Sequence, residues 1–384
     1  METFGSLVRG HLPPAGEKVL VGPASPAPAS EATRFPGYLA TWVDSGTSAL
    51  ALGLLDIARR QRREGRNEVI IPAYCCPDLV AAIHYAGLFP VAVDLAVDDC
   101  GYDLGSLTRA LSDATCAVIA VNFLGLSDDL GALRSLLSHF PEVALIEDNA
   151  QWFPDASDNS RLTGDYVVFS FGRGKPVSLL GGGVLLHRKP LEASTPAPRS
   201  LSAAQRLRLR LKYAVYNQLL EPFYYQALSR NPLIKLGETR YSPLRSIEGM
   251  DDRRYSLLDR NIAQHRGRSR GAEQAYDQAL GNVNALTGLF SDRRRRLLRY
   301  PLLVPDAIAQ QRIMATLKGY GVTTLYQRSI DHFVNSGYLR KEGLCPNATD
   351  FASRLLTLPV HSRVTARHQA LIISAILSEL DPTG

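Results

Sequence analysis

Residues 143–151 read Val-Ala-Leu-Ile-Glu-Asp-Asn-Ala-Gln, a short apolar run that ends abruptly in polar side chains. An apolar run of this length, bounded by polar residues, is typical of a buried β-strand. Open α/β sheets bind their ligands at the carboxyl ends of such strands. The stretch therefore predicts a central strand followed by a candidate site at Asp148 and Gln151, although Asp148 could also be an ordinary strand-end cap.

Six further β-rich runs surround this stretch, and helical patterns separate the first five of the seven predicted strands. The strands are predicted at Ala40–Asp44, Glu68–Ile71, Val91–Asp94, Ala117–Val121, Val143–Glu147, Tyr166–Ser170 and Gly183–His187. The helices between them are predicted at Thr47–Gln61, Pro77–Gly87, Leu104–Leu111 and Leu130–His139. This alternation requires crossover connections, so it predicts an α/β fold with a mostly parallel seven-stranded sheet covered on both faces.

The chain is predicted to consist of three parts. Residues 1–36 form an N-terminal arm with prolines toward its end, residues 37–245 a large domain, and residues 246–384 a smaller α/β domain. The smaller domain is expected to contain one long helix from Gly249 to Leu280, a strand at Leu298–Val304, and helices near Ala307–Tyr320 and Val364–Leu380. The run Arg293–Arg296 is interpreted as a solvated charged turn.

Residues 191–244 are predicted to be a helical insertion within the large domain. Basic residues alternate with leucine and an aromatic cluster follows, in the order Arg206, Arg208, Arg210, Lys212, Tyr213, Tyr216, Phe223, Tyr224 and Tyr225. The favoured interpretation is a solvated helix whose aromatic residues pack on the main domain. A lid or an element resting on a membrane surface is the alternative.

The amino-acid composition indicates an ordinary globular protein. Of the 384 residues 45% are hydrophobic and 21% charged, which is the ordinary globular mixture. A net charge of +6 over this length disfavours a dedicated nucleic-acid binder. The five cysteines are odd in number and no long apolar run is present, which favours a soluble protein of the reducing cytoplasm. No second Cys or His pair stands near Cys75 and Cys76 at metal-binding spacing, so no metal site is expected.

Three strand ends carry the groups that pyridoxal phosphate chemistry requires: a lysine amine, a carboxylate and a phosphate cradle. The first strand runs into Ser45-Gly46-Thr47-Ser48 at a predicted helix N-terminus, which favours anions, although Ser and Thr also simply cap helices. The strand at 143–147 runs into Asp148 and Gln151. The strand at 166–170 ends at Ser170 and leads into a glycine-rich turn that carries Lys175.

This ordered set of motifs resembles the DegT/DnrJ/EryC1/StrS family of sugar aminotransferases, which are fold type I pyridoxal phosphate enzymes. The resemblance covers roughly residues 40–190 and 245–380. Any one motif is common, but their order and spacing together are specific. They are Ser45–Leu50, Glu68–Pro72, Gly87–Val91 with Asp94, Glu147–Asp148 with Gln151, Ser170–Phe171 with Lys175, Gly182–Gly183, and Leu358–His361 with Thr365.

The resemblance implies a homodimer, with active sites at the interface, that moves an amino group from an amino acid, expected to be glutamate, to a keto sugar expected to be nucleotide-linked. It implies that Lys175 forms the Schiff base and moves the proton, and that Asp148 holds the pyridine nitrogen protonated. Gln151 would bind the ring hydroxyl. The full expected cofactor-binding set is Gly46, Thr47, Ser48, Cys76, Asp148, Gln151, Ser170 and Lys175.

Several departures from the family pattern leave the substrate open. Cys76 stands where the family usually places an aromatic that stacks on the cofactor, so stacking would be weaker or supplied by another residue such as Tyr74. Asn122 replaces a usual histidine, Gly181 an acidic residue, and the partner-subunit asparagine aligns near Arg240 or Tyr241. Two alternatives therefore stay open: a catalytically silent regulatory homologue, and an enzyme of this fold that acts on a non-sugar or lipid-linked substrate.

Overall fold

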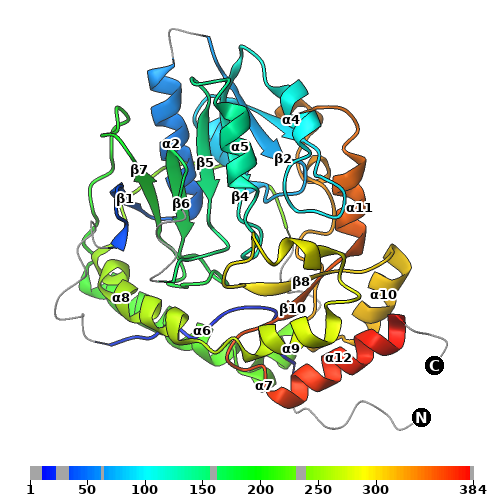
Figure 1. Cartoon of the computed structure of the whole chain (residues 1–384). Helices are drawn as coiled ribbons and strands as arrows, with labels where there is room; N and C mark the ends of the chain where they lie inside the picture. Colours follow the sequence, from blue (N-terminus) through cyan, green and yellow to red (C-terminus); the bar gives the residue numbers. More distant parts are fainter. Residues whose placement is uncertain (1–10, 23–33, 62–64, 156–161, 231–238, 381–384) are drawn as a thin grey trace.

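The computed structural model describes residues 11–22, 34–61, 65–155, 162–230 and 239–380 (Figure 1). All seven predicted strands form and lie in one sheet, in the order β1-β7-β6-β5-β4-β2-β3, and a two-residue strand β9 extends it beyond β3. Their bounds are β1 Leu39–Val43, β2 Glu68–Pro72, β3 Phe89–Val93, β4 Thr115–Val121, β5 Ala144–Asp148, β6 Tyr166–Ser170, β7 Gly183–His187 and β9 Arg340–Lys341. Pairing is parallel from β6 through β9, while β7 is antiparallel to both β6 and β1.

Helices cover both faces of this sheet, as predicted. They are α2 Gly46–Arg60, α3 Asp78–Tyr85, α4 Leu104–Ala110 and α5 Leu130–Leu137. Alternate residues of β2 point to opposite faces: Val69 and Ile71 join the core cluster that contains α2 and α3, whereas Ile70 joins the cluster that contains α4 and α5. Both faces are thus buried, which accounts for the nearly continuous apolar sequence of the central strands.

Most of the C-terminal part forms a second layer below the sheet in Figure 1, while the helix at Pro346–Arg354 lies beside the sheet. It comprises α8 Asp252–Gly267, α9 Gly271–Leu280, β8 Arg299–Leu303, α10 Ala307–Thr316, α11 Pro346–Arg354, β10 Leu355–Pro359 and α12 Ala366–Leu380. Strands β8 and β10 pair antiparallel as a separate two-stranded sheet. Because β9 comes from this part of the chain and pairs with β3, the C-terminal part also contributes to the large sheet. The division between residues 245 and 246 stays a prediction.

The expectation of one helix from Gly249 to Leu280 is wrong, because the chain leaves helical geometry at Arg268. The ψ angle of Arg268 is 131°, an extended value. Its guanidinium turns inward and donates to the carbonyl oxygens of Val360 at 2.6 Å and Leu297 at 2.7 Å. These tertiary bonds hold the junction between α8 and α9, where the sequence Gly267-Arg268-Ser269-Arg270-Gly271 has no apolar side chain and interrupts the helical pattern.

The predicted insertion is helical. Helix α6 spans Ala203–Leu219 and α7 spans Pro222–Ser229. Ser202 and Gln205 form a reciprocal capping box at the start of α6. Within the predicted aromatic cluster Tyr213 is fully buried, but Phe223 is 70% exposed. The packing interpretation therefore holds for only part of the cluster.

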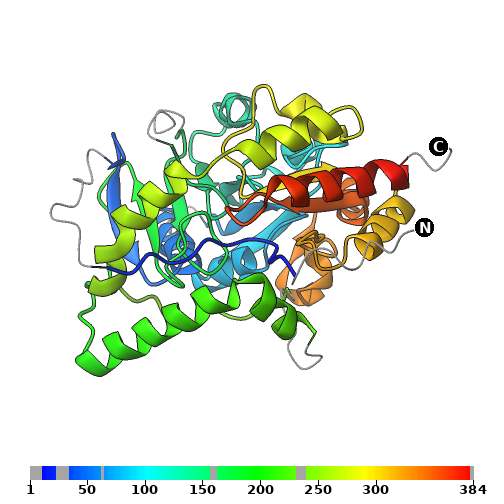
Figure 2. The same cartoon turned by 90° about the horizontal axis from the view of Figure 1, so that it is seen from below.

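Residues 11–22 form a strap across the underside of the molecule, visible in Figure 2 as the dark blue trace that runs between α6 and α8. Asn217 of α6 exchanges two hydrogen bonds with the backbone of Val19, and Asn261 of α8 does the same with Leu20. Two side-chain amides thus hold the strap much as a neighbouring β-strand would. The prolines Pro23, Pro26 and Pro28 of the predicted arm lie outside the described residues.

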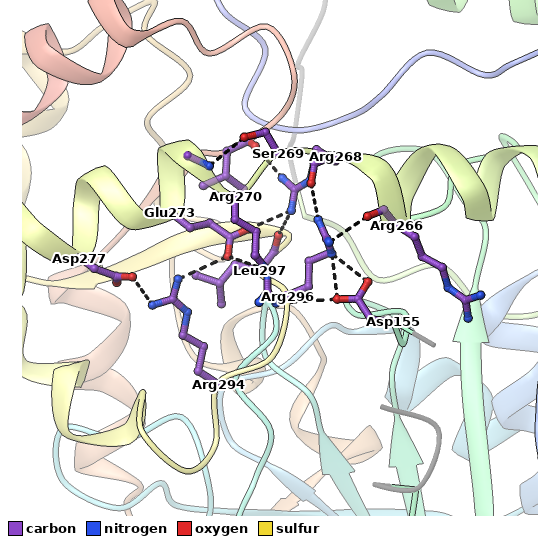
Figure 3. Close-up of polar contacts among 12 residues, drawn as sticks. Asp155, Arg266, Arg268, Ser269, Arg270, Glu273, Asp277, Arg294, Arg296 and Leu297 are labelled. Carbon is purple, nitrogen blue, oxygen red and sulfur yellow. Dashed lines mark hydrogen bonds and ion pairs between the residues drawn. The ribbon is translucent and has the colours of Figure 1, made fainter. Parts of the chain in front are cut away.

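The run Arg293–Arg296 is not a solvated turn, and that interpretation is corrected by the structure. Arg293 forms a two-pronged ion pair with Asp99, at 2.5 and 2.8 Å. The guanidinium of Arg295 lies 4.4 Å from the ring centre of Trp152. Arg294 and Arg296 point into the polar cluster drawn in Figure 3. Each arginine thus has a partner on another segment, and the run fastens the C-terminal part to the large sheet.

Glu273 lies at the centre of that cluster. It is 1% exposed and accepts from Arg268 at 3.0 Å and from Arg294 at 3.4 Å (Figure 3). Arg296 lies on the other side, bound to Asp155 and to the carbonyl oxygens of Arg266 and Arg268. Because the carboxylate neutralises buried guanidinium groups, its loss would leave positive charge without a partner in a low-dielectric environment.

Within the ranges that the structure describes, no helix combines the length and the apolar character needed to span a bilayer.

We predict that Glu273→Gln lowers the free energy of unfolding by about 3 kcal/mol, since breaking a buried ion pair from one side typically costs that much. The matched control is Asp277→Asn, which removes a partner of Arg294 that is 33% exposed and should cost less than about 1 kcal/mol. Urea denaturation of both variants followed by circular dichroism gives the comparison. Equal losses of unfolding free energy in the two variants would show that the burial of Glu273 does not increase its contribution to stability.

Candidate active site

A pocket opens where the carboxyl ends of β5 and β6 meet the amino end of α2. It is lined by Gly46, Thr47, Leu50, Cys76, Asp78, Leu79, Val121, Asp148, Ala150, Gln151, Ser170, Lys175 and Tyr326. Seven of the eight residues expected to bind the cofactor are in this lining. The eighth, Ser48, is fully buried beside the pocket. Gly46 and Lys175, 129 positions apart in sequence, are thus brought together by the order of the strands.

The amino end of α2 combines capping with an open anion site. The Ser45 hydroxyl accepts from the Ser48 N–H at 3.0 Å, and the two hydroxyls lie 2.8 Å apart, so both serve the cap. Thr47 remains in the pocket lining together with Ser170 from the end of β6. The positive end of the helix dipole adds to this arrangement, which suits a phosphate group.

Gly46 and Ser170 are in close contact, and this contact sets the shape of the cradle. A Cβ atom at position 46 would lie 2.5 Å from the Cβ of Ser170, so only glycine fits there. Gly183 is constrained in the same way, since its Cβ would lie 2.4 Å from the carbonyl oxygen of Ser45. The first turn of α2 is therefore pressed directly against the ends of β6 and β7.

Asp148 and its neighbour Glu147 lie on opposite faces of β5, because side chains alternate along a strand. Asp148 faces the pocket, where its Oδ1 accepts from the Ala150 N–H at 2.9 Å. Glu147 is 2% exposed and accepts from the N–H groups of Thr163 and Gly164 on the other side. Its carboxylate is committed to that loop and does not line the pocket.

Electrostatics single out Asp148. Burial raises the pKa of its carboxyl above the usual value, while the Ala150 N–H and the nearby Lys175 ammonium offset part of this rise. A buried carboxylate of this kind is best stabilised by a cationic group placed opposite its free oxygen. The site thus favours a positively charged group over a neutral one beside Asp148.

Lys175 lies in the tight turn between β6 and β7. The turn is closed by a hydrogen bond from the Lys175 N–H to the Gly172 carbonyl oxygen at 3.3 Å, and Gly174 has a φ of +74°, a conformation that favours glycine. The insertion supports this segment, because the Tyr213 hydroxyl of α6 donates to the Leu179 carbonyl oxygen at 3.2 Å. The backbone that carries Lys175 is therefore held by its own turn and by the contact with α6.

Tyr326 is a site residue that sequence reasoning missed. Gln151 donates from Nε2 to the Tyr326 hydroxyl at 2.9 Å, while its Oε1 accepts from the Leu124 N–H at 2.9 Å. Both ends of the amide are thereby fixed. Tyr326 comes from the C-terminal part, in a stretch with no periodic pattern, so nothing local in the sequence marks it. Asp78 was missed as well, although its place directly after Pro77 at a helix start was a usable signal.

The expected replacement for the missing ring-stacking aromatic is not Tyr74. Tyr74 is 2% exposed and its hydroxyl donates to the Tyr326 carbonyl oxygen at 2.9 Å, so it packs behind Tyr326 and does not line the pocket. Cys76 does line the pocket. Burial and the neighbouring Asp78 raise the pKa of its thiol to about 12, so it presents a neutral, polarisable sulfur.

The other departures from the family pattern have local structural reasons. Asn122 donates from Nδ2 to Asn149 Oδ1 at 3.1 Å and is buried. Gly181 has a φ of +148°, and a Cβ there would lie 3.0 Å from Nε of Arg254. Arg254 donates to the carbonyl oxygens of Leu179 and Leu180, close to the Lys175 turn. The Arg254 side chain thus fills the space beside Gly181.

Comparison with known proteins agrees with this arrangement. Residues 34–201 match the DegT/DnrJ/EryC1/StrS aminotransferase family. The chain is 29% identical over 343 residues to the erythromycin biosynthesis sensory transduction protein EryC1 of Saccharopolyspora erythraea, covering 87% of this chain and 84% of that protein. The solved structure of AtS13 from Actinomadura melliaura has a TM-score of 0.63 at 22% identity, covering 88% of this chain and 86% of AtS13.

Two further relatives match over a shorter length. GDP-4-keto-6-deoxy-D-mannose 3-dehydratase of Escherichia coli O55:H7 is 25% identical over 160 residues, and GDP-perosamine synthase of Vibrio cholerae is 29% identical over 165 residues. These matches cover 40% and 41% of this chain and span only 41% and 44% of the two relatives. The predicted fold class, a fold type I arrangement with a large, mostly parallel sheet, is confirmed by the solved neighbours. The match to the DegT/DnrJ/EryC1/StrS aminotransferase family thus covers residues 34–201, which hold all of the pocket-lining residues except Tyr326.

Proposed function

We propose that this protein is a pyridoxal phosphate-dependent aminotransferase that moves an amino group from an amino acid, glutamate in the first instance, to a nucleotide-linked keto sugar. The observation that carries the proposal is that Asp148, Gln151, Ser170 and Lys175 line one pocket at the amino end of α2. A carboxylate, an amide, a hydroxyl and an amine are the groups that this cofactor needs around it.

The pocket residues have distinct tasks in this proposal. When bound, the cofactor supplies an electron sink for the carbon that loses or gains the amino group. Asp148 holds a proton on the ring nitrogen through its free carboxylate oxygen, while the Ala150 N–H orients the other oxygen. Gln151, fixed by Leu124 and Tyr326, binds the ring hydroxyl. Thr47 and Ser170, with the amino end of α2, hold the phosphate.

Lys175 attaches the cofactor and then acts as the acid and base at the reacting carbon. Its turn places the amine in the same pocket as Asp148 without an ion pair between them. One relative of this chain is named as a 3-dehydratase. The proposal therefore has to argue for amino transfer at the sugar separately from dehydration. The presence of Lys175, which can take up and return a proton, supports amino transfer.

The proposal also includes a homodimer with its active sites at the interface, a large domain at 37–245, a small domain at 246–384 and a cytoplasmic location. The dimer is proposed from the resemblance to the DegT/DnrJ/EryC1/StrS family. All five cysteines are free, which suits a reducing compartment.

The first prediction tests the reaction class. Adding glutamate to the cofactor-loaded protein should bleach its visible absorbance, and a keto sugar nucleotide should restore it, because the amino group is carried on the cofactor between two half-reactions. Stopped-flow absorbance and mass spectrometry of the sugar give the readout. A bound cofactor that ignores every amino donor would favour a silent regulatory homologue, and a deoxygenated sugar without nitrogen would indicate a dehydratase.

The second prediction concerns Lys175. Lys175→Ala should reduce turnover by about a thousandfold or more, since the nucleophile and proton carrier are both lost. Borohydride reduction followed by peptide mass spectrometry should locate the cofactor on Lys175 in the unaltered protein. Lys189→Ala, an exposed lysine after β7, is the control and should keep both label and rate. Label on another lysine would reassign the role.

The third prediction concerns Asp148. Asp148→Asn should leave cofactor binding largely intact and lower kcat by about 10² to 10⁴, because a neutral amide cannot hold the ring nitrogen in its protonated form. Glu147→Gln is the matched control: it should lower the thermal unfolding temperature, through its loop at Thr163 and Gly164, with a smaller effect on kcat. If Glu147→Gln lost the rate and Asp148→Asn did not, the roles would be exchanged.

A further inference from the structure

Helix α6 carries two apolar faces, and only one of them is used by the fold. Leu209 and Tyr213 are buried against the body of the protein. On the opposite side Leu207, Leu211 and Val215 are 59%, 59% and 58% exposed. A spacing of four residues places these three side chains in one row along the helix. Side chains of this kind normally need a partner when they form a continuous row.

Basic side chains flank the row on both sides. At about 100° per residue, Arg208 and Lys212 lie along one edge and Arg210 along the other. All three are exposed, and none of the acidic side chains that the structure describes forms an ion pair with them. Arg206 is different, because it pairs with Asp252 of α8. Helix α6 contains no Asp or Glu at all.

Helix α7 also exposes large apolar side chains. Phe223 is 70% exposed and Tyr224 is 43% exposed, and their rings contact each other edge to face at 5.4 Å. The sole acidic residue at the start of α7, Glu221, pairs with Lys18 of the strap at 2.5 Å. The row on α6, its three flanking cations and these two aromatic side chains are called the α6–α7 patch below.

The chemistry of the α6–α7 patch decides between two occupants. A symmetric contact with a second copy of this chain would set the same cations against one another, which is unfavourable in an interface where each patch faces itself. An anionic lipid surface meets both demands, since its headgroups neutralise the cations while its acyl boundary accepts leucine and aromatic side chains. We propose that the α6–α7 patch binds the protein to anionic membrane surfaces. This inference does not depend on the proposed aminotransferase activity.

The helix is also suited to such a contact mechanically. Its buried face is held by Tyr213, which donates to Leu179, and by Asn217, which binds the strap at Val19. The outward face can therefore enter a headgroup layer without any rearrangement of the core. In Figure 2, α6 is the long green helix that runs along the outer edge of the fold.

Vesicle flotation tests the proposal with the full-length, cofactor-loaded protein. Phosphatidylcholine vesicles that contain about 30 mol% phosphatidylglycerol should bind the protein, pure phosphatidylcholine vesicles should bind it at least about tenfold more weakly, and salt should weaken the binding. The charge variant is R208Q/R210Q/K212Q, and the apolar variant is L207Q/L211Q/V215Q. Each should lose about tenfold or more in apparent affinity for the anionic vesicles.

Matched controls change the same residue types at exposed positions elsewhere. They are R109Q/K189Q/R367Q for charge and V97Q/I308Q/L344Q for apolar area. Both controls should bind as the unaltered protein does, and thermal unfolding by circular dichroism checks that all variants fold. Failure of the unaltered protein to bind anionic vesicles, or equal binding by patch and control variants, would overturn the proposal. Loss of a dimer in the apolar variant, seen by light scattering without vesicle binding, would assign the patch to a second copy.

Discussion

The pocket depends on one steric constraint: two segments of backbone meet where no side chain can fit between them. The first turn of α2 lies against the end of β6 at Gly46 and Ser170, and against the start of β7 at Gly183 and Ser45. This contact brings the positive end of a helix, a strand-end hydroxyl and the Lys175 turn to one point. A methyl group at position 46 or 183 would force these elements apart. Electrostatics and chemistry in the pocket follow from this packing.

Much of this arrangement could be predicted from the sequence, because it depends on local patterns of apolar and polar residues. The strands are short apolar runs that end in polar residues, and the residues at their carboxyl ends, such as Asp148 and Ser170, must lie at the same edge of a parallel sheet. Seven of the eight expected cofactor residues line the pocket for this reason. Ser48 does not line the pocket, because its hydroxyl contacts Ser45 in the cap of α2. From sequence alone, Ser48 could equally well cap the helix or bind the phosphate.

Features that depend on distant partners could not be predicted. The guanidinium of Arg268 binds carbonyl groups of residues 297 and 360, and the arginine run at 293–296 has acidic and aromatic partners on other segments. Tyr326 reaches Gln151 across 175 positions of sequence. In each case a polar side chain in a patternless stretch is ordered by tertiary contacts, where local propensity carries little information. The exposed row on α6 could not be predicted either. Leucine alternates with basic residues along this helix, and the sequence does not show that Leu209 is buried while Leu207 and Leu211 are exposed.

The strap at residues 11–22 has a consequence for the order in which the protein assembles. Its partners lie far along the chain: Asn217 is 198 positions from Val19, Asn261 is 241 positions from Leu20, and His361 is 348 positions from Pro13. During synthesis the strap leaves the ribosome long before these partners, and His361 is made 348 residues after Pro13. Contacts of such long range must wait for the elements they join. The strap is therefore made before its partners but takes its place after them, and it closes over helices that have already packed.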